Sequence, residues 1–120
     1  MSKTVLLVED EFLIAMDLTL VLERHGWIVI GPAATVKKAL ALLQIQLPSV
    51  ALLDVTLKDG TVTPVAEALR ASDVPFVIAS AYETPEDVGG AVLAGAINVG
   101  KPTDARDLLN TLEQVLRSSP

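Results

Sequence analysis

Cysteine is absent from this chain of 120 residues, and aromatic residues make up only 3% of it. Without cysteine the chain can form no disulfide framework, no zinc ribbon and no thiol nucleophile. With so few aromatic rings, the core has to be built from Leu, Val, Ile and Ala, and a hydrophobic content of 51% is sufficient for that. The composition therefore predicts one compact folded domain spanning residues 1–120.

Basic charge and long apolar runs are also scarce. The formal net charge is −6, whereas nucleic-acid binding requires clustered Lys and Arg side chains that contact phosphates. No segment approaches the roughly 18 apolar residues of a membrane span, and the run Val5–Val8 is too short for the core of a signal peptide. We therefore expect a cytoplasmic domain that contacts proteins and binds neither nucleic acid nor membrane.

Strand-like and helix-like segments alternate five times along the chain. Three strand candidates are continuous apolar runs, which is typical of strands buried on both faces of a parallel sheet. Apolar residues at helical spacing follow each strand, and the weak stripe Val88, Ala91 and Val92 predicts the fourth helix. Such units predict a flavodoxin-like α/β fold, a (βα)5 three-layer sandwich with parallel strand order 2-1-3-4-5. The predicted strands are Thr4–Val8, Trp27–Gly31, Val50–Asp54, Phe76–Ala79 and Ala96–Val99.

Carboxylates stand where two of these strands end. Glu9 and Asp10 follow Val5–Val8, and Asp54 follows Val50–Leu53. Ligands of doubly wound sheets bind beyond the carboxyl ends of the strands near the topological switch point, here between the first and third strands. Three ionised carboxylates in one crevice would repel one another, and a Mg²⁺ ion, which prefers oxygen ligands, would resolve that conflict. Asp54 is then a candidate nucleophile toward a phosphoryl group.

Two further polar residues follow the fourth and fifth predicted strands. Ser80 comes directly after Phe76–Ala79, and its hydroxyl can donate a hydrogen bond to a phosphoryl oxygen. Lys101 precedes Pro102, and its ammonium can offset the charge of the same group. The Lys101–Pro102 bond is also a candidate cis peptide. All of these side chains are expected at one edge of the sheet.

Taken in order, these motifs resemble the receiver domain of bacterial two-component response regulators. The resemblance extends from residue 3 to about residue 117, and the motifs are strong jointly although each is weak alone. The stretches that carry it are Val5-Leu6-Leu7-Val8-Glu9-Asp10-Glu11, Leu52-Leu53-Asp54-Val55-Thr56-Leu57-Lys58-Asp59-Gly60, Ala79-Ser80-Ala81 and Lys101-Pro102.

The resemblance implies a role for each residue of the acidic cluster. Asp54 would accept a phosphoryl group from a phosphohistidine on a sensor histidine kinase or a phosphotransfer protein. Asp10 and Asp54 would bind Mg²⁺ directly, together with the backbone carbonyl of Thr56. Glu9 would hold the metal through a water molecule. The domain would then catalyse only its own phosphorylation and dephosphorylation.

The resemblance also implies an output. Ser80 and Lys101 would bind the phosphoryl group and relay its presence to a change of conformation. A downstream target protein would sense that change on the face formed by the fourth helix, the fifth strand and the fifth helix. The same face admits a homodimer.

The chain departs from the family pattern at the switch that relays phosphorylation. The family usually has an aromatic residue three positions before the lysine, where this chain has Asn98. The spacing from Gly95-Ala96 to Lys101 is also one residue shorter than usual. Tyr82, two residues beyond Ser80, is a candidate for a substitute switch or for a shield over the phosphoryl group.

Two other functions compete with the phosphoacceptor hypothesis. A haloacid-dehalogenase-like phosphohydrolase also uses a strand-ending Asp with Mg²⁺, but that class prefers a second Asp two residues later, where this chain has Thr56. A phosphate-independent pseudo-receiver would act only as a binding adaptor. The intact acidic cluster, Ser80 and Lys101 argue against the adaptor.

Overall fold

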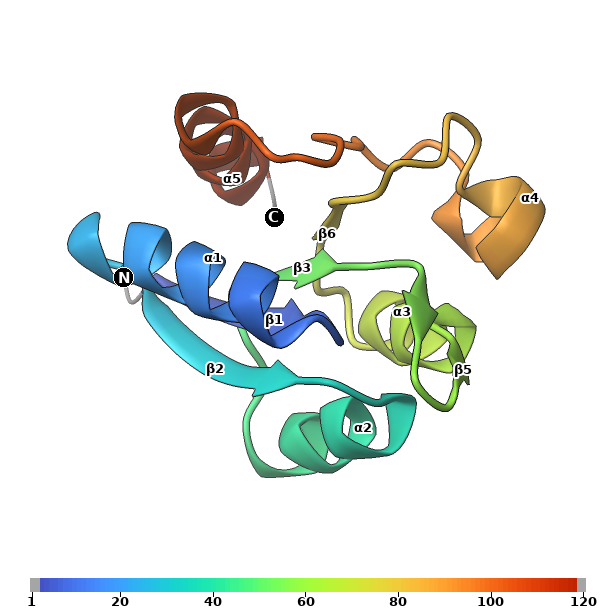
Figure 1. Cartoon of the computed structure of the whole chain (residues 1–120). Helices are drawn as coiled ribbons and strands as arrows, with labels where there is room; N and C mark the ends of the chain where they lie inside the picture. Colours follow the sequence, from blue (N-terminus) through green and yellow to red (C-terminus); the bar gives the residue numbers. More distant parts are fainter. Residues whose placement is uncertain (1–2, 119–120) are drawn as a thin grey trace.

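Four parallel strands form the centre of the structure, a computed structural model that describes residues 3–118 (Figure 1). They lie in the order β2-β1-β3-β6, which matches the predicted order of the first four strands and confirms the flavodoxin-like α/β fold. The elements are β1 (Thr4–Val8), α1 (Phe12–Arg24), β2 (Ile28–Ala33), α2 (Val36–Ile45), β3 (Val50–Leu53), β4 (Thr56–Leu57), β5 (Gly60–Thr61), α3 (Thr63–Ala71), β6 (Phe76–Ile78), α4 (Glu86–Gly89), the 3₁₀ helix η1 (Ala91–Leu93) and α5 (Ala105–Ser118).

Helices cover both faces of the sheet, with α1 and α5 on one side and α2 and α3 on the other (Figure 1). Side chains of β1 alternate between these layers, because successive residues of a strand point to opposite faces. Leu6 joins the core with α2 and α3, and Leu7 joins the core with α1 and α5. Both faces of the central strands are therefore apolar, which accounts for the continuous hydrophobic runs in the sequence. Over residues 3–118, no helix has the length and apolar character needed to cross a membrane.

The fifth predicted strand is reduced to a single bridge. Asn98 pairs in parallel with Ile78 of β6. The Ile78 N–H donates to the carbonyl of Ile97 at 2.8 Å, and the Val99 N–H donates to the carbonyl of Ile78 at 2.8 Å. The segment therefore lies where a fifth strand of the 2-1-3-4-5 order belongs, but it leaves the sheet on either side of this bridge.

The fourth predicted helix is interrupted at a pair of glycines. α4 ends at Gly89, and Gly90 has a φ of +96°, a left-handed conformation that only glycine adopts readily. The chain resumes as the short helix η1, so the stripe of Val88, Ala91 and Val92 is divided between two elements. The hydroxyl of Thr63 in α3 donates to the carbonyl of Gly89, which ties α4 to α3. The face expected from a continuous fourth helix is correspondingly incomplete.

A small hairpin, β4–β5, interrupts the connection between β3 and α3, and the sequence did not predict it. Its turn carries Asp59, whose carboxylate oxygens accept hydrogen bonds from the backbone N–H groups of Val36 at 2.7 Å and Lys37 at 3.1 Å. These are the first residues of α2, and unpaired N–H groups at a helix start favour a nearby carboxylate. The Val36 N–H is the main reason that the pKa of Asp59 lies below its ordinary value.

Candidate functional site

The carboxyl ends of β1 and β3 lie side by side because these strands pair in parallel. Val8 of β1 is the register partner of Leu53 of β3. The backbone N–H of Asp54 donates to the carbonyl of Val8 at 2.8 Å. The residues that follow these two strands, Glu9 and Asp54, therefore leave the sheet at the same place.

Three carboxylates meet at this place. One oxygen from each of Glu9, Asp10 and Asp54 lies within 4.8 Å of the other two. Glu9 is only 2% exposed and Asp54 is 9% exposed, whereas Asp10 is half-buried. Burial of several like charges is unfavourable unless cations or hydrogen-bond donors compensate for it.

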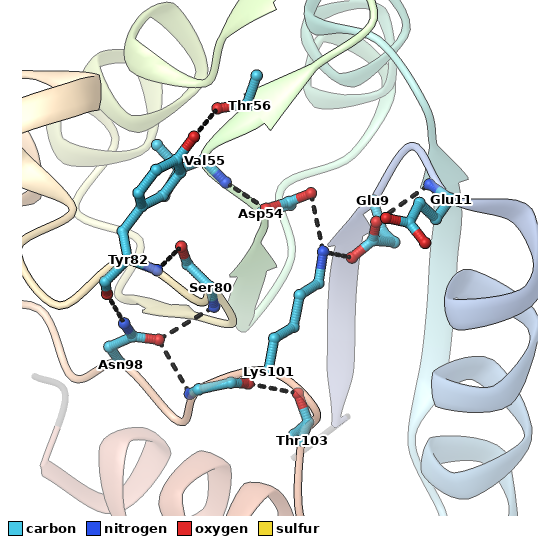
Figure 2. A network of polar contacts seen from close by, with 11 residues as sticks. Glu9, Glu11, Asp54, Val55, Thr56, Ser80, Tyr82, Asn98, Lys101 and Thr103 are labelled. Atoms are coloured by element: carbon cyan, nitrogen blue, oxygen red, sulfur yellow. Dashed lines mark hydrogen bonds and ion pairs between the residues drawn. The ribbon is translucent and has the colours of Figure 1, made fainter.

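Lys101 places a positive charge between two of these carboxylates (Figure 2). Its Nζ lies 2.9 Å from Oε1 of Glu9 and 3.0 Å from Oδ2 of Asp54. The lysine side chain is 17% exposed, so water screens these ion pairs less than it screens pairs on the surface. Lys101 reaches the acids from the loop before α5, and its bond to Pro102 is cis, as predicted.

Burial and pairing oppose each other in the protonation of these groups. Burial raises the pKa of Glu9 above its ordinary value, and hydrogen bonds from Lys101 and from the Glu11 N–H offset only part of that effect. Burial also acts to lower the pKa of Lys101, but the contacts with Glu9 and Asp54 outweigh it and raise that pKa. Lys101 therefore keeps its positive charge, and its hydrogen bond to Glu9 favours the charged form of that carboxyl by lowering its pKa.

The carboxylate of Asp54 is held in one orientation by two donors. Its Oδ1 accepts a hydrogen bond from the Val55 N–H at 2.8 Å, and its Oδ2 accepts one from Lys101 at 3.0 Å. Glu9 also uses both oxygens, because its Oε2 accepts from the Glu11 N–H at 3.0 Å. A nucleophile that is oriented before the reaction avoids much of the entropic cost of reaching the transition state.

Ser80 lies in the loop that follows β6, the strand next to β3. The N–H of Ala79 donates to the carbonyl of Leu53 at 2.9 Å, which brings the end of β6 next to the end of β3. Ser80 is 3% exposed, and its Oγ accepts a hydrogen bond from the N–H of Tyr82 at 3.0 Å. The predicted phosphoryl contacts, Ser80 and Lys101, thus come from two loops beside the Asp54 carboxylate (Figure 2).

Asn98 connects these two loops. Its Oδ1 accepts hydrogen bonds from the N–H of Ser80 at 3.1 Å and from the N–H of Gly100 at 2.9 Å. Its Nδ2 donates to the carbonyl of Tyr82 at 2.9 Å. The residue that replaces the usual aromatic side chain therefore makes three specific polar contacts around the site (Figure 2).

Tyr82 extends the network to the third loop of the site. Its hydroxyl lies 3.3 Å from Oγ1 of Thr56, on the β3 side (Figure 2). Thr56 is exposed, and its side chain faces Tyr82 where a phosphohydrolase of the haloacid-dehalogenase type would have a second carboxylate. The role of the Thr56 backbone carbonyl as a metal ligand stays a prediction.

The donor set fits a hard divalent cation. Glu9, Asp10 and Asp54 offer carboxylate oxygens only, and such oxygens are the ligands that Mg²⁺ prefers over imidazole or thiolate. Asp10 is the most accessible of the three, which suits a direct ligand. Glu9 already uses one oxygen for Lys101 and one for Glu11, which suits contact through water.

Sequence reasoning missed the polar contacts made by Asn98 and the contact between Tyr82 and Thr56. Asn98 drew attention only as a departure from the family pattern, and nothing in its local sequence indicates its partners. Two of its three partners are distant, because Ser80 lies 18 residues away and Tyr82 lies 16 residues away, whereas Gly100 is only two residues away. The one available signal is that a polar side chain stands where an aromatic side chain is usual.

Comparison with known proteins places the chain among signalling regulators. The model of the response regulator receiver domain matches residues 5–113. The transcriptional regulatory protein PdtaR of Mycobacterium tuberculosis is 31% identical over 114 residues, covering 92% of this chain and 55% of that protein. The phyllosphere-induced regulator PhyR of Methylorubrum extorquens is 32% identical over 120 residues, covering 97% of this chain and 44% of that protein. The chain thus spans about half the length of these two relatives.

Solved structures agree with the sequence matches. The CheY-like response regulator receiver domain protein of Methanospirillum hungatei superposes with a TM-score of 0.86 at 27% identity, covering 99% of this chain and 97% of that one. Both chains are therefore similar along nearly their whole length. The shared sheet positions the carboxylates at its carboxyl edge.

Proposed function

This chain belongs to the response regulator receiver domain family, and on that premise we propose that Asp54 accepts a phosphoryl group from a phosphohistidine of a sensor kinase or phosphotransfer protein. A carboxylate oxygen of Asp54 forms the new P–O bond while the P–N bond to histidine breaks. The observation that carries the proposal is the position of Lys101, whose Nζ bridges Glu9 and Asp54 at 2.9 and 3.0 Å. The Asp54 carboxylate is held in place, and the Lys101 ammonium beside it could bind the negative charge of a phosphoryl group on Asp54.

Lys101 and Ser80 would stabilise the transferred group. The Lys101 ammonium is already beside Asp54, so it can contact a phosphoryl oxygen with a small movement of its flexible side chain. The Ser80 hydroxyl accepts the Tyr82 N–H and still has its own O–H to donate. These two donors support acceptance of a phosphoryl group rather than mere tolerance of buried acids.

A divalent metal would be held on the acidic side of the site. Asp10 and Asp54 would bind Mg²⁺ directly with the Thr56 carbonyl, and Glu9 would hold it through water. When bound, the ion would neutralise charge that develops on the phosphoryl oxygens. The residues of the chain would supply the ligands, orient the nucleophile and return the domain to its resting state by hydrolysis of the acyl phosphate.

The output would be a change of conformation that a partner protein senses. Phosphoryl contacts at Ser80 and Lys101 alter loops that lead to α4 and α5, so the two states differ on that side of the molecule. The net charge of −6 favours a protein partner over nucleic acid for this domain. The sensor kinase and the downstream target both belong to this proposal.

Incubation with Mg²⁺ and acetyl phosphate tests the proposal directly. Intact-mass spectrometry should show one added phosphoryl group on the wild-type chain and none on Asp54→Asn. Asp17→Asn, which removes an exposed carboxylate on α1, is the matched control and should be phosphorylated normally.

The same experiment separates the competing functions. A chain that binds no Mg²⁺ and gains no phosphoryl group would be an adaptor of the pseudo-receiver type. A chain that rapidly hydrolyses external phosphoesters would be a phosphohydrolase. Either result would contradict the phosphoacceptor proposal.

A further inference from the structure

The two loops that would contact the phosphoryl group share one hydrogen-bond acceptor. Oδ1 of Asn98 accepts from the backbone N–H of Ser80 at 3.1 Å and from that of Gly100 at 2.9 Å. Gly100 directly precedes Lys101 in the chain. The amide oxygen therefore bonds to the backbone of Ser80 and to the residue directly before Lys101, and thus links the two predicted phosphoryl contacts.

The backbone of Gly100, directly before Lys101, is held by hydrogen bonds at both its N–H and its carbonyl. The N–H of Gly100 is held by Asn98, and the carbonyl of Gly100 accepts a hydrogen bond from the hydroxyl of Thr103 at 2.7 Å. Gly100 has a φ of +82°, so the turn that directs Lys101 toward the acids adopts a left-handed conformation. The direction of the lysine side chain thus depends on a turn whose geometry Asn98 and Thr103 define.

The orientation of the Asn98 amide follows from its partners. Two backbone N–H groups face one terminal atom and a carbonyl faces the other, so only an oxygen at the first position and an NH₂ at the second satisfy all three contacts. Both ends of the amide are consequently in use. An apolar or aromatic side chain at this position cannot make these contacts.

We propose that Asn98 is a positioning residue that fixes the spacing between the Ser80 and Lys101 donors, and so sets how well the site binds a phosphoryl group on Asp54. The inference rests on the proposed function, because the spacing matters only if a phosphoryl group binds there. Asn98 contacts neither Asp54 nor the acidic cluster in any hydrogen bond of the described residues. Its effect is therefore on the phosphoryl donors and not on the carboxylates that would hold the metal.

The amide nitrogen adds a connection to the third loop. By donating to the Tyr82 carbonyl, Asn98 also fixes the backbone of the residue whose hydroxyl contacts Thr56. The three loops around Asp54 are thereby linked through Asn98 and Tyr82 (Figure 2). Loss of the amide should loosen the Ser80–Tyr82 loop and the Gly100–Lys101 turn relative to each other.

The test compares the binding of beryllofluoride, which mimics a phosphoryl group on a carboxylate, with the binding of Mg²⁺ alone. Asn98→Leu keeps a similar shape and removes all three hydrogen bonds, and Asn98→Ala removes them without adding bulk if the Leu variant does not fold. Asn110→Leu, on the exposed side of α5, is the matched control. Beryllofluoride binding is followed by ¹⁹F NMR, Mg²⁺ binding by calorimetry and the folded state by thermal melting.

We expect Asn98→Leu to weaken beryllofluoride binding and slow phosphorylation by acetyl phosphate about 10- to 100-fold, because a misplacement of about 1 Å in a reacting site costs about 100-fold. Mg²⁺ affinity should stay at the wild-type value, because Glu9, Asp10 and Asp54 follow β1 and β3 and make no hydrogen bond with Asn98. In a double-mutant cycle, Asn98→Leu should cost less in a Ser80→Ala background, because its effect passes partly through Ser80. Asn110→Leu should change neither affinity.

Three outcomes would overturn the inference. Wild-type beryllofluoride affinity in Asn98→Leu would show that the spacing does not depend on the amide. An equal fold-loss of Mg²⁺ and beryllofluoride affinity, together with a lower melting temperature, would show general structural damage instead of positioning. Failure of the wild-type chain to bind beryllofluoride at all would remove the proposed function together with the inference, whereas the first two outcomes leave the proposed function intact.

Discussion

The two halves of the site are built in different ways. The three carboxylates, or acidic half, are positioned by the buried strands that precede them. The residues that would contact a phosphoryl group, or donor half, are positioned by hydrogen bonds between loops. Glu9 and Asp54 follow strands whose side chains lie almost wholly in the core. Ser80 and Lys101 belong to loops that meet through the side chain of Asn98. The acidic half consists of Glu9, Asp10 and Asp54, and the donor half consists of Ser80, Asn98 and Lys101.

Because of this difference, substitutions in the two halves should have different effects on stability and on phosphoryl chemistry. A change under the acidic half removes packing and should destabilise the whole domain. A change in the donor half removes polar contacts that are partly open to water, so it should alter phosphoryl chemistry more than folding. Four substitutions follow in order of their expected effect on stability. The first lies under the acidic half, the second lies in the donor half, and the last two affect contacts outside both halves.

Leu52→Ala should have the largest effect on stability. Leu52 lies in β3, two residues before Asp54, and is 1% exposed. Truncation of a buried leucine leaves a cavity and should lower the free energy of unfolding by about 2–5 kcal/mol. Leu20→Ala, at an α1 position that is 47% exposed, is the control and should change it by about 0.5 kcal/mol or less. Equal effects in urea unfolding would break the proposed link between core packing and the acidic half.

Lys101→Met should have an intermediate effect. It leaves Glu9 and Asp54 without their shared cation, and the free energy of unfolding should fall by about 2 kcal/mol, less than for fully buried pairs because Lys101 keeps some contact with water. Added Mg²⁺ should narrow the difference in unfolding free energy between variant and wild type, because carboxylates freed of Lys101 should bind the cation more tightly and a ligand that binds the folded state stabilises it. Lys58→Met removes the same charge from an exposed hairpin position and should leave stability unchanged. A gap that Mg²⁺ does not narrow would argue against metal binding by these acids.

Asp59→Asn should have a smaller effect that depends on pH. The pKa of Asp59 lies below its ordinary value of 3.8, mainly because of the Val36 N–H. A depressed pKa stabilises the folded state above the unfolded pKa, and that contribution disappears as the pH falls through the folded pKa. The wild-type chain should therefore melt at a higher temperature than the variant at neutral pH, and the difference should shrink as the pH falls below 3.8 and vanish once the pH is below the lowered pKa of the folded state. Asp17→Asn serves as the charge control, and a pH-independent difference would exclude the capping contact as its cause.

Tyr82→Ala should have the smallest effect on folding. Tyr82 is 43% exposed, and its hydroxyl makes a single contact with Thr56. Phosphorylation by acetyl phosphate should change far less than in Asn98→Leu. If Tyr82 has taken over the aromatic switch, the variant should no longer bind a partner differently before and after phosphorylation. Unchanged discrimination between the two states would exclude Tyr82 as the switch.

The acidic half could be predicted from the sequence because its signals are local. The apolar runs before Glu9 and Asp54 show strands buried on both faces, and the rule for parallel sheets brings the ends of the first and third strands together. β1 has the predicted bounds, and β3 ends one residue before the predicted end at Asp54. The family and the fold followed from the same residues.

The donor half could not be predicted in the same way because its geometry depends on contacts between distant residues. The segment Ala96–Val99 has the composition of a strand, yet only Asn98 forms a bridge with the sheet. Directly after it, the N–H of Gly100 bonds to the Asn98 side chain within the loop. The fourth helix was predicted from its apolar spacing and from the Thr84-Pro85 start signal, and the positive φ of Gly90 interrupts it. Helical periodicity does not report such a conformation.

The most direct measurement of the central claim is the location of the phosphoryl group. The chain is phosphorylated with acetyl phosphate and Mg²⁺, treated with borohydride to reduce the acyl phosphate to an alcohol, and digested for peptide mass spectrometry. We predict that the reduced residue is Asp54 and that Asp54→Asn yields no reduced residue. Reduction at Asp10 or at any other carboxylate of the wild-type chain would contradict the assignment of Asp54 as the phosphoacceptor.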